Sequence, residues 1–327
     1  MRTPLLLFAA LIFSATGRAQ DVHVRVSPEV TTGIHGTNAF PTIQMAIDHH
    51  PWPGPGGRVV IEIAPGVYHE RLNITQNHPE ITLLGMGKSP AEVTITNSLN
   101  AKDAGGTFFT ETVEVDGEGF EADNVTFENA AGNTGQAVAI AVRADRAVFK
   151  HCRFLGHQDT LFADWGRQYY VDSYIEGGVD FIFGNAAAVF DHDELHANGP
   201  GYLTAQSRTS PAEATGYAIV NSRVTADPGA SKIWLGRPWR PYSRVVYIDT
   251  ELPADVVPEG WNNWGSAANE HTAWYGEYGS SGPGNRPLAR VSWAHKLTAD
   301  QAVWFRPDTF LAGSDHWDPV AAAAKLP

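Results

Sequence analysis

A pattern of short strand-like segments that recurs at a near-constant interval constrains the fold of this chain more than any other feature. Copies begin at Asn124, Arg146 and Gln168, which are evenly spaced, and a weaker copy begins at Ala187 after a slightly shorter interval. Internal periods of roughly 20–50 residues are typical of solenoids, in which each repeat is one structural unit. We therefore expect one period to form one coil of a parallel β-helix. A β-sandwich would not require a steady interval.

The rest of the chain favours an all-β architecture in one domain. From about residue 58, short runs rich in β-branched and aromatic residues alternate with Gly, Asn and Asp, as in strands joined by turns. A chain of 327 residues is long for one globular core, but a solenoid escapes that limit because each repeat packs only on its neighbours. Ile43, Ala46 and Ile47 follow helical spacing after Pro41, and we expect a short helix that caps the N-terminal end of the solenoid.

The N-terminal segment, residues 1–19, has the pattern of a secretory signal peptide. Arg2 supplies a positive charge, residues 5–13 form an apolar run too short to span a bilayer, and Gly17 and Ala19 are small residues placed for cleavage after Ala19. We expect residues 1–19 to be removed, residues 20–327 to form the folded domain, and the protein to be secreted into the medium or the periplasm. No later segment is apolar enough to predict a membrane span.

Charge and cysteine content exclude other classes. The formal net charge of the chain is −13, whereas proteins that bind nucleic acids or anionic membranes use a basic surface. Cys152 is the only cysteine, so no internal disulfide can form. Its segment alternates like a strand with Cys152 on the face of Val148 and Phe154, and we interpret it as a small buried hydrophobe rather than a catalytic thiol.

Polar residues that interrupt the repeats come into register when the coils are stacked. Gln136 and Gln158 are one period apart, and Asp159 and Asp180 are separated by almost the same interval. Residues one period apart in stacked coils lie about 4.8 Å from each other. We therefore expect these four side chains to converge on one face over three coils, and Arg237, from a later coil, to reach the same face.

This cluster suits acyl transfer. Two carboxylates about 5 Å apart do not ionise independently, so the pKa of one should rise and that of the other should fall. A bidentate arginine would keep one carboxylate charged as a nucleophile and leave its protonated partner as a general acid. Glutamine amides donate hydrogen bonds without adding charge, as an oxyanion hole requires.

The same residues allow other interpretations. The glutamines could form a polar ladder between coils, and carboxyls about 5 Å apart also suit a retaining glycosidase. An enzyme that hydrolyses a different ester or thioester and a non-catalytic polysaccharide-binding solenoid are further alternatives. His192, Glu194 and His196 would share one face of a strand and could hold zinc, but turn polarity explains them more simply and the chemistry above needs no metal.

Several motifs in order carry a resemblance to the pectin methylesterase (pectinesterase) family over roughly residues 37–312. The motifs are Gly66-Val67-Tyr68-His69-Glu70, Gln136-Ala137-Val138-Ala139, Gly156-His157-Gln158-Asp159-Thr160-Leu161, Asp180-Phe181-Ile182-Phe183-Gly184 and Leu235-Gly236-Arg237-Pro238-Trp239. The resemblance implies a right-handed parallel β-helix and hydrolysis of the C6 methyl esters of polygalacturonate.

The resemblance also implies roles by motif position. Asp180 matches the nucleophile, Asp159 the general acid and base, Gln136 and Gln158 the oxyanion donors, and Arg237 the arginine that holds the nucleophile.

Four aromatic residues are candidates for the substrate groove. Trp239 matches an aromatic residue that stacks on the substrate, and we expect Phe183 and Trp261 to line the same groove. Phe162, where many members have tyrosine, is a fourth candidate that lacks a hydroxyl. The implied partner is methyl-esterified pectin (homogalacturonan), with no cofactor, no nucleic acid and no membrane, and we expect a monomer.

Overall fold

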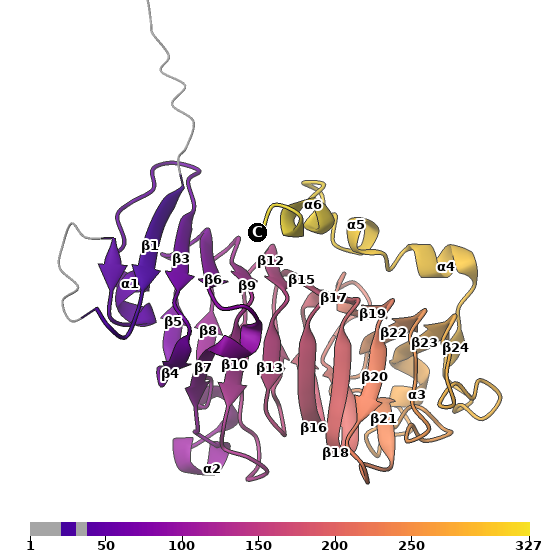
Figure 1. Ribbon diagram of the computed structural model, residues 1–327. Coiled ribbons are helices and arrows are strands. Elements are labelled where there is room, and N and C mark those ends of the chain that lie inside the picture. Colours follow the sequence, from indigo (N-terminus) through magenta and orange to yellow (C-terminus); the bar gives the residue numbers. More distant parts are fainter. Residues whose placement is uncertain (1–20, 31–37) are drawn as a thin grey trace, which may run out of the picture.

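The computed structural model describes residues 21–30 and 38–327, so the expected signal peptide lies outside the described residues. The chain winds into parallel strands stacked side by side along one axis (Figure 1). The first sheet contains β1 (Val22–Val26), β2 (Ala39–Phe40), β3 (Val59–Ile63), β6 (Ile81–Gly85), β9 (Glu121–Asp123), β12 (Ala147–Lys150), β15 (Arg167–Val171), β17 (Ala187–Asp191), β19 (Gly216–Val220), β22 (Arg244–Ile248), β23 (Trp274–Tyr278) and β24 (His295–Lys296).

The remaining strands form two further faces, which are joined by two long bent strands. The second face contains β4 (Gly66–Tyr68), β7 (Val93–Asn97), β10 (Thr126–Asn129), β13 (Arg153–Leu155), the first parts of β16 (Tyr174–Gly184) and β18 (Glu194–Gln206), and β20 (Arg223–Ala226). The third face contains β5 (Leu72–Ile74), β8 (Val113–Val115), β11 (Ile140–Val142), β14 (Leu161–Ala163), the last parts of β16 and β18, and β21 (Ile233–Gly236). The predicted right-handed parallel β-helix is confirmed.

Short helices cover the ends and one side of the β-helix. They are α1 (Ile43–His49), η1 (Pro90–Glu92), α2 (Ala101–Ala104), η2 (Thr107–Phe109), α3 (Asn269–Thr272), α4 (Ala299–Val303), α5 (Pro307–Phe310) and α6 (Pro319–Ala323). The predicted capping helix is α1, which buries Ile43, Ala46 and Ile47. Thr42 caps it by accepting a hydrogen bond from the Met45 amide (3.2 Å), because the first N–H groups of a helix have no partner within it.

The C-terminal segment packs on the outer face of the first sheet. Figure 1 shows α4, α5 and α6 running back across the tops of the strands towards β12. Phe305, Leu311 and Leu326 bury their side chains in one cluster with outward residues of the sheet, including Val148 and Val246. This face of the sheet is therefore covered, whereas the third face remains available to a ligand.

Pairing between coils departs from a constant interval. Phe149 in β12 pairs with Tyr170 of the next coil and with Ala122 of the preceding coil, and the second interval along the sequence is the longer. The sequence pattern predicts Phe127 as the counterpart of Phe149, and this is wrong, because Phe127 lies in β10 on another face and pairs with Phe154. Connections of different length separate the strands, so a fixed spacing identifies neighbouring coils but not their register.

Left-handed residues turn the chain at the corner between the first two faces. Each of six successive strands of the first sheet ends just before one of them: Asn124, His151, Asp172, His192, Asn221 and Asp249. The turn at His151 reverses the alternation of side chains. Cys152 and Phe154 therefore face the interior as predicted, whereas Val148 lies on the outer face, contrary to the prediction.

Stacked aromatic rings fill the interior between coils. Phe149 and Tyr170 are nearly parallel, with their ring centroids 4.8 Å apart, and Tyr170 lies 4.7 Å from Phe190. These rings occupy paired positions of β12, β15 and β17, so the repeat places them above one another. The stack fixes the spacing of the coils from which the polar residues of the third face project.

Candidate active site

The floor of the site is an apolar row on the outer side of the third face. Ala141, Phe162, Phe183 and Ala205 occupy paired positions in β11, β14, β16 and β18. The rings of Phe162 and Phe183 stack with their centroids 4.6 Å apart. Trp239 packs against this row, with its ring 6.0 Å from that of Phe183. Flat apolar surfaces of this kind are suited to packing against sugar rings.

The polar residues lie at the corner where the chain enters the third face. Gln136 pairs with Gln158, and Gln158 pairs with Val179 in the next coil. Asp159 therefore lies one coil from Asp180, and its amide donates to the carbonyl of Val179 (3.1 Å). The predicted stacking of two glutamines and two aspartates over three coils is present in the backbone pairing.

Both aspartates have left-handed backbone, with φ of 64° at Asp159 and 50° at Asp180. Aspartate tolerates this conformation better than most residues because its short side chain can hydrogen-bond locally. Asp180 lies at the irregular bend of β16, where the pairing with β18 shifts register. The aspartates are therefore positioned by turn geometry that the stacked coils hold in place.

Arg237 follows β21 and forms a bidentate ion pair with Asp180. Its Nε lies 2.8 Å from Oδ1 of Asp180, and its Nη2 lies 2.6 Å from Oδ2. The guanidinium is sandwiched between the rings of Tyr202 and Trp264, each 3.8 Å from its central carbon. A planar guanidinium matches a carboxylate and stacks on aromatic rings at the same time, which a lysine could not do.

Burial and charge separate the two carboxyls. Burial raises the pKa of Asp159 to about 8, with a further rise from the neighbouring charge of Asp180 and an opposing effect of Arg237. Burial also raises the pKa of Asp180, against the hydrogen bonds and charge of Arg237. The expectation that one pKa would fall is therefore wrong, because burial outweighs the arginine at Asp180. Only Asp180 has a hydrogen-bonded cation, so we infer that it ionises before Asp159.

A cavity of about 310 Å³ joins these groups. It is lined by Thr107, Phe108, Gln136, Gln158, Asp159, Asp180, Phe183, Ala205, Arg237, Trp239 and Trp264. A neighbouring cavity of about 430 Å³ shares Phe108 and Trp239 with it and adds Phe162 and Arg143. Together they form an extended depression, which we call the groove.

The structure brings together eight of the nine predicted site residues, and Trp261 is the exception. Trp261 is only 1% exposed and packs in the interior between Tyr247 and Tyr275, so its predicted place in the groove is wrong. Its pairing with Gly236 continues the stack of coils and directs the indole inwards.

The sequence interpretation missed the residue that takes the place of Trp261. Trp264, which follows shortly after it, reaches the groove and stacks on Arg237. The side-chain oxygen of Asn262 accepts the Trp264 amide (2.8 Å) in a tight turn. The two asparagines between the tryptophans signal that turn in the sequence. Tyr202, which stacks on the other side of the Arg237 guanidinium, has no comparable signal in the sequence.

The remaining candidates do not form a site. Cys152 is buried, and burial raises the pKa of its thiol, so it is not a reactive thiolate. Within residues 21–30 and 38–327, no group of three His, Cys, Asp or Glu side chains could hold a metal ion. His196 instead contacts Thr225 (2.7 Å) and Asp227 (3.2 Å). Over the same residues no helix is long and apolar enough to cross a membrane.

Comparison with known proteins assigns the chain to a family. The pectinesterase family model matches residues 29–314. Pectinesterase 31 of Arabidopsis thaliana is 40% identical over 297 residues, which cover 88% of this chain and 92% of the relative. Pectinesterase 1 of Citrus sinensis is 38% identical over 88% of this chain, but the match covers only 52% of that protein.

Solved structures agree with the sequence relatives. The pectin methylesterase from carrot superposes with a TM-score of 0.82 at 34% identity, covering 89% of this chain and 93% of that one. The pectin methylesterase PemA from Erwinia chrysanthemi gives a TM-score of 0.73 at 28% identity, covering 90% and 98%. With a family model that covers most of its length and a relative at 40% identity, this chain belongs to the pectinesterase family of carboxylic ester hydrolases.

Proposed function

We propose that this chain hydrolyses the C6 methyl esters of polygalacturonate in pectin, releasing methanol and leaving free carboxylates, and that Asp180 is the nucleophile. The observation that carries the proposal is the asymmetric pair of buried aspartates, of which only Asp180 has a bidentate guanidinium. The aromatic groove beside it supports a carbohydrate substrate. A pectin methylesterase with a related structure (TM-score 0.73) has been solved in complex with a hexasaccharide.

In the first step the ionised carboxylate of Asp180 attacks the ester carbonyl carbon. Arg237 keeps this carboxylate charged and fixes its orientation through two hydrogen bonds. The oxygen of the tetrahedral intermediate then needs donors, and the side-chain amides of Gln136 and Gln158 line the same cavity. As the intermediate collapses, protonated Asp159 donates its proton to the departing methanol.

In the second step the roles reverse. Asp159, now a carboxylate, takes a proton from a water molecule, which attacks the acyl carbon of the anhydride formed with Asp180. This step regenerates the Asp180 carboxylate, leaves Asp159 protonated again and releases the galacturonate carboxyl as the acid, which then loses its proton to bulk water. The raised pKa of Asp159, about 8, suits a group that must hold a proton in one step and accept it in the next.

The aromatic residues of the groove support binding of the polymer. Phe183, Phe162 and Trp239 form its apolar floor and wall, and Trp264 contributes a partly exposed ring at the catalytic end. Phe162 lacks a hydroxyl, so it can contribute only packing. The Arg143 guanidinium lies 5.5 Å from the Phe162 ring in the second part of the groove, where its charge is paired with nearby carboxylates, including that of Asp164 (3.7 Å).

The proposed function is tested by measuring methanol and new reducing ends in the same reaction with highly methylated pectin. Methanol without reducing ends is the expected result. Reducing ends without methanol would instead assign the aspartates to glycosidase chemistry. If neither product formed, a different ester or a binding role would be indicated.

We also propose that the protein is exported and is a monomer. The signal-peptide pattern of residues 1–19 supports export, and the self-contained stack of coils supports a monomer. N-terminal sequencing of secreted protein should give a start near Gln20, and light scattering should give the mass of one chain.

A further inference from the structure

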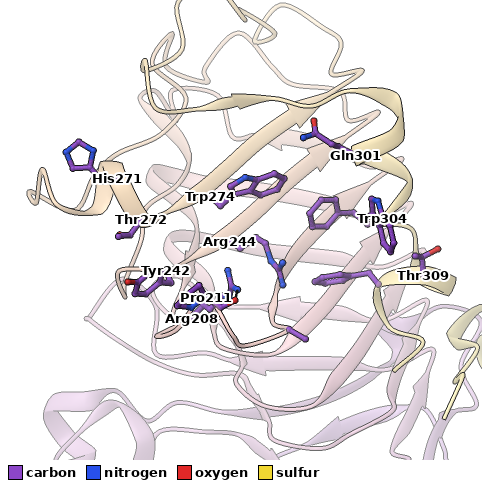
Figure 2. Close-up of a pocket in the computed structure, with 13 residues that line it drawn as sticks. Arg208, Pro211, Tyr242, Arg244, His271, Thr272, Trp274, Gln301, Trp304 and Thr309 are labelled. Atoms are coloured by element: carbon purple, nitrogen blue, oxygen red, sulfur yellow. Dashed lines mark hydrogen bonds between the residues drawn. The ribbon is translucent and has the colours of Figure 1, made fainter. Parts of the chain in front are cut away.

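A second large cavity lies where the C-terminal segment covers the first sheet. Its volume is about 650 Å³, within the range of roughly 300–1,000 Å³ that is typical of small-ligand sites. Figure 2 shows Arg244 and Trp274 in its middle, Arg208, Pro211 and Tyr242 on one side, and Gln301, Trp304 and Thr309 of the C-terminal segment on the other. We call it the arginine cavity.

Two guanidiniums in this cavity, those of buried Arg208 and half-buried Arg244, have no carboxylate partner among the described residues. Arg208 donates through Nε to the carbonyl of Glu213 (2.9 Å) and through Nη2 to that of Pro211. Arg244 donates through Nε (2.9 Å) and Nη2 to the carbonyl of Thr215. Among the described residues neither arginine forms an ion pair within 4.0 Å, in a chain whose net charge is −13.

The two cations also destabilise each other. Burial and the charge of Arg208 lower the pKa of Arg244 to about 10. Burial lowers the pKa of Arg208, and Glu213 only partly opposes this, because the carboxylate of Glu213 accepts hydrogen bonds from Thr209 and Asn185 instead. An anionic group between the guanidiniums would relieve both effects.

Aromatic rings and neutral polar groups complete the cavity. The rings of Trp274 and Phe305 stack with their centroids 5.5 Å apart, and Trp304 is 68% exposed at the rim. The Gln301 and Thr272 side chains also line the wall. Flat rings, neutral hydrogen-bonding groups and a cationic centre match a sugar ring that carries a carboxylate better than they match a small inorganic anion.

The arginine cavity adjoins the groove through two shared segments. In the first segment Ser207 and Thr209 face the groove, whereas Arg208 between them faces the arginine cavity. In the second segment Trp239 and Arg240 face the groove, whereas Tyr242 and Arg244 face the arginine cavity. The groove and the arginine cavity are therefore separated only by these two chain segments.

We propose that the arginine cavity is a second carbohydrate site, which binds a free uronate of de-esterified pectin through Arg208 and Arg244. The identity of the ligand rests on the proposed function, since ester hydrolysis in the groove generates such carboxylates next to this cavity. The groove takes the neutral ester and the arginine cavity takes the charged product. The two sites thus differ in the charge state of the same sugar.

The test is a calorimetric titration with trigalacturonate, its neutral counterpart α-1,4-galactotriose, and inorganic phosphate. Arg244→Gln should weaken trigalacturonate binding by about ten- to a hundredfold, as loss of a charged hydrogen bond would. Trp304→Ala, at an exposed position where folding is little affected, should weaken it by about two- to tenfold. Arg223→Gln, which removes an exposed arginine elsewhere, is the matched control and should bind normally.

The outcomes separate this inference from the proposed function. If Arg244→Gln and Trp304→Ala both bound trigalacturonate like the wild type, the second site would be excluded, even if methanol were released. If phosphate or galactotriose bound as tightly as trigalacturonate, the uronate assignment would be wrong. If trigalacturonate bound through Arg244 but pectin yielded no methanol, the proposed function would be wrong, whereas the assignment of the arginine cavity as a uronate site would remain supported.

Discussion

Two regions of this molecule bury aspartates, and only one of them has the properties of an active site. At the groove, Asp159 and Asp180 come from adjacent coils. At the corner between the first two faces, Asp191 and Asp193 flank a single residue, and Asp193 is 1% exposed. Burial raises the pKa of Asp193 well above its usual range, so a raised pKa alone does not distinguish the regions.

The difference lies in the partners and the access of the carboxyls. Asp193 accepts a hydrogen bond from the Ser173 amide (2.7 Å), and among the described residues it forms no ion pair with an arginine or lysine and lines none of the cavities described above. Asp180 has Arg237, and both groove aspartates line a cavity. A buried acid becomes a candidate catalyst when a cation sets the charge of its neighbour and a ligand can reach it. Without these features it is part of the core.

The largest expected contrast is between Asp180→Asn and Asp193→Asn. Removing the nucleophile should lower methanol release by about 10⁴-fold or more, because groups that act as a unit fail together. Asp193→Asn should leave the rate within about twofold of wild type, since Asp193 is remote from the cavity. Initial rates on methylated pectin, with circular dichroism as a check on folding, measure both. More than a few per cent of activity in Asp180→Asn would contradict the nucleophile assignment.

The next prediction compares two neutral side-chain amides, one beside the groove aspartates and one beside the aspartates of the corner. Gln158→Ala should lower the catalytic rate by roughly a hundredfold, as loss of one oxyanion donor does. Asn221 donates a hydrogen bond to Asp191 (2.9 Å) at the other corner and is the matched amide. Asn221→Ala should cost about 1 kcal/mol of stability, because alanine tolerates its left-handed backbone poorly, and should not change the rate. If both variants lost activity equally, the distinction between a catalytic amide at the groove and a structural amide at the corner would be wrong.

The pH dependence of the rate tests whether Asp159 acts as the general acid. Asp159 must carry a proton to protonate methanol, so the rate should fall as the pH rises through about 8, by roughly tenfold per pH unit beyond it. Below that pH the limit should come from protonation of Asp180. Initial rates between pH 4 and 10 give the profile. A rate that continued to rise above pH 9 would mean that Asp159 acts only as a base.

The smallest effect is on stability at the corner. The pKa of Asp193 is higher in the folded than in the unfolded protein, so its contribution to stability is complete below its unfolded pKa and is lost as the pH rises towards the folded value. Asparagine does not titrate, so Asp193→Asn should gain stability relative to wild type between pH 5 and pH 9. Melting temperatures at the two pH values measure this, and a constant difference between variant and wild type would contradict it.

The fold class and most of the site could be predicted from the sequence because both depend on the repeat. At the site, the spacing within the glutamine pair and within the aspartate pair equals the length of one coil. The sequence therefore predicts that these polar side chains cluster. Elsewhere the coils vary in length, and for that reason the pattern predicts the wrong partner and the wrong face for Phe127. Local regularity at the site, rather than regularity of the whole chain, made the prediction possible.

Features that depend on tertiary contacts could not be predicted in the same way. Trp261 and Trp264 have similar sequence surroundings, and only the turn made by Asn262 decides which indole reaches the groove. The sandwich of Arg237 between Tyr202 and Trp264 joins residues from separate coils with no common spacing. The rise in the pKa of Asp180 follows from the depth of burial, which the sequence pattern does not contain.

A ¹³C NMR titration of the aspartate carboxyl groups tests the division of roles between Asp159 and Asp180 most directly, with resonances assigned from the Asp159→Asn, Asp180→Asn and Asp193→Asn variants. We predict that the Asp159 carboxyl titrates near pH 8, that Asp180 titrates at lower pH because of Arg237, and that Asp193 stays protonated where Asp180 is ionised. A spectrum in which Asp159 and Asp180 were both fully ionised at pH 5 would contradict the division of roles between them.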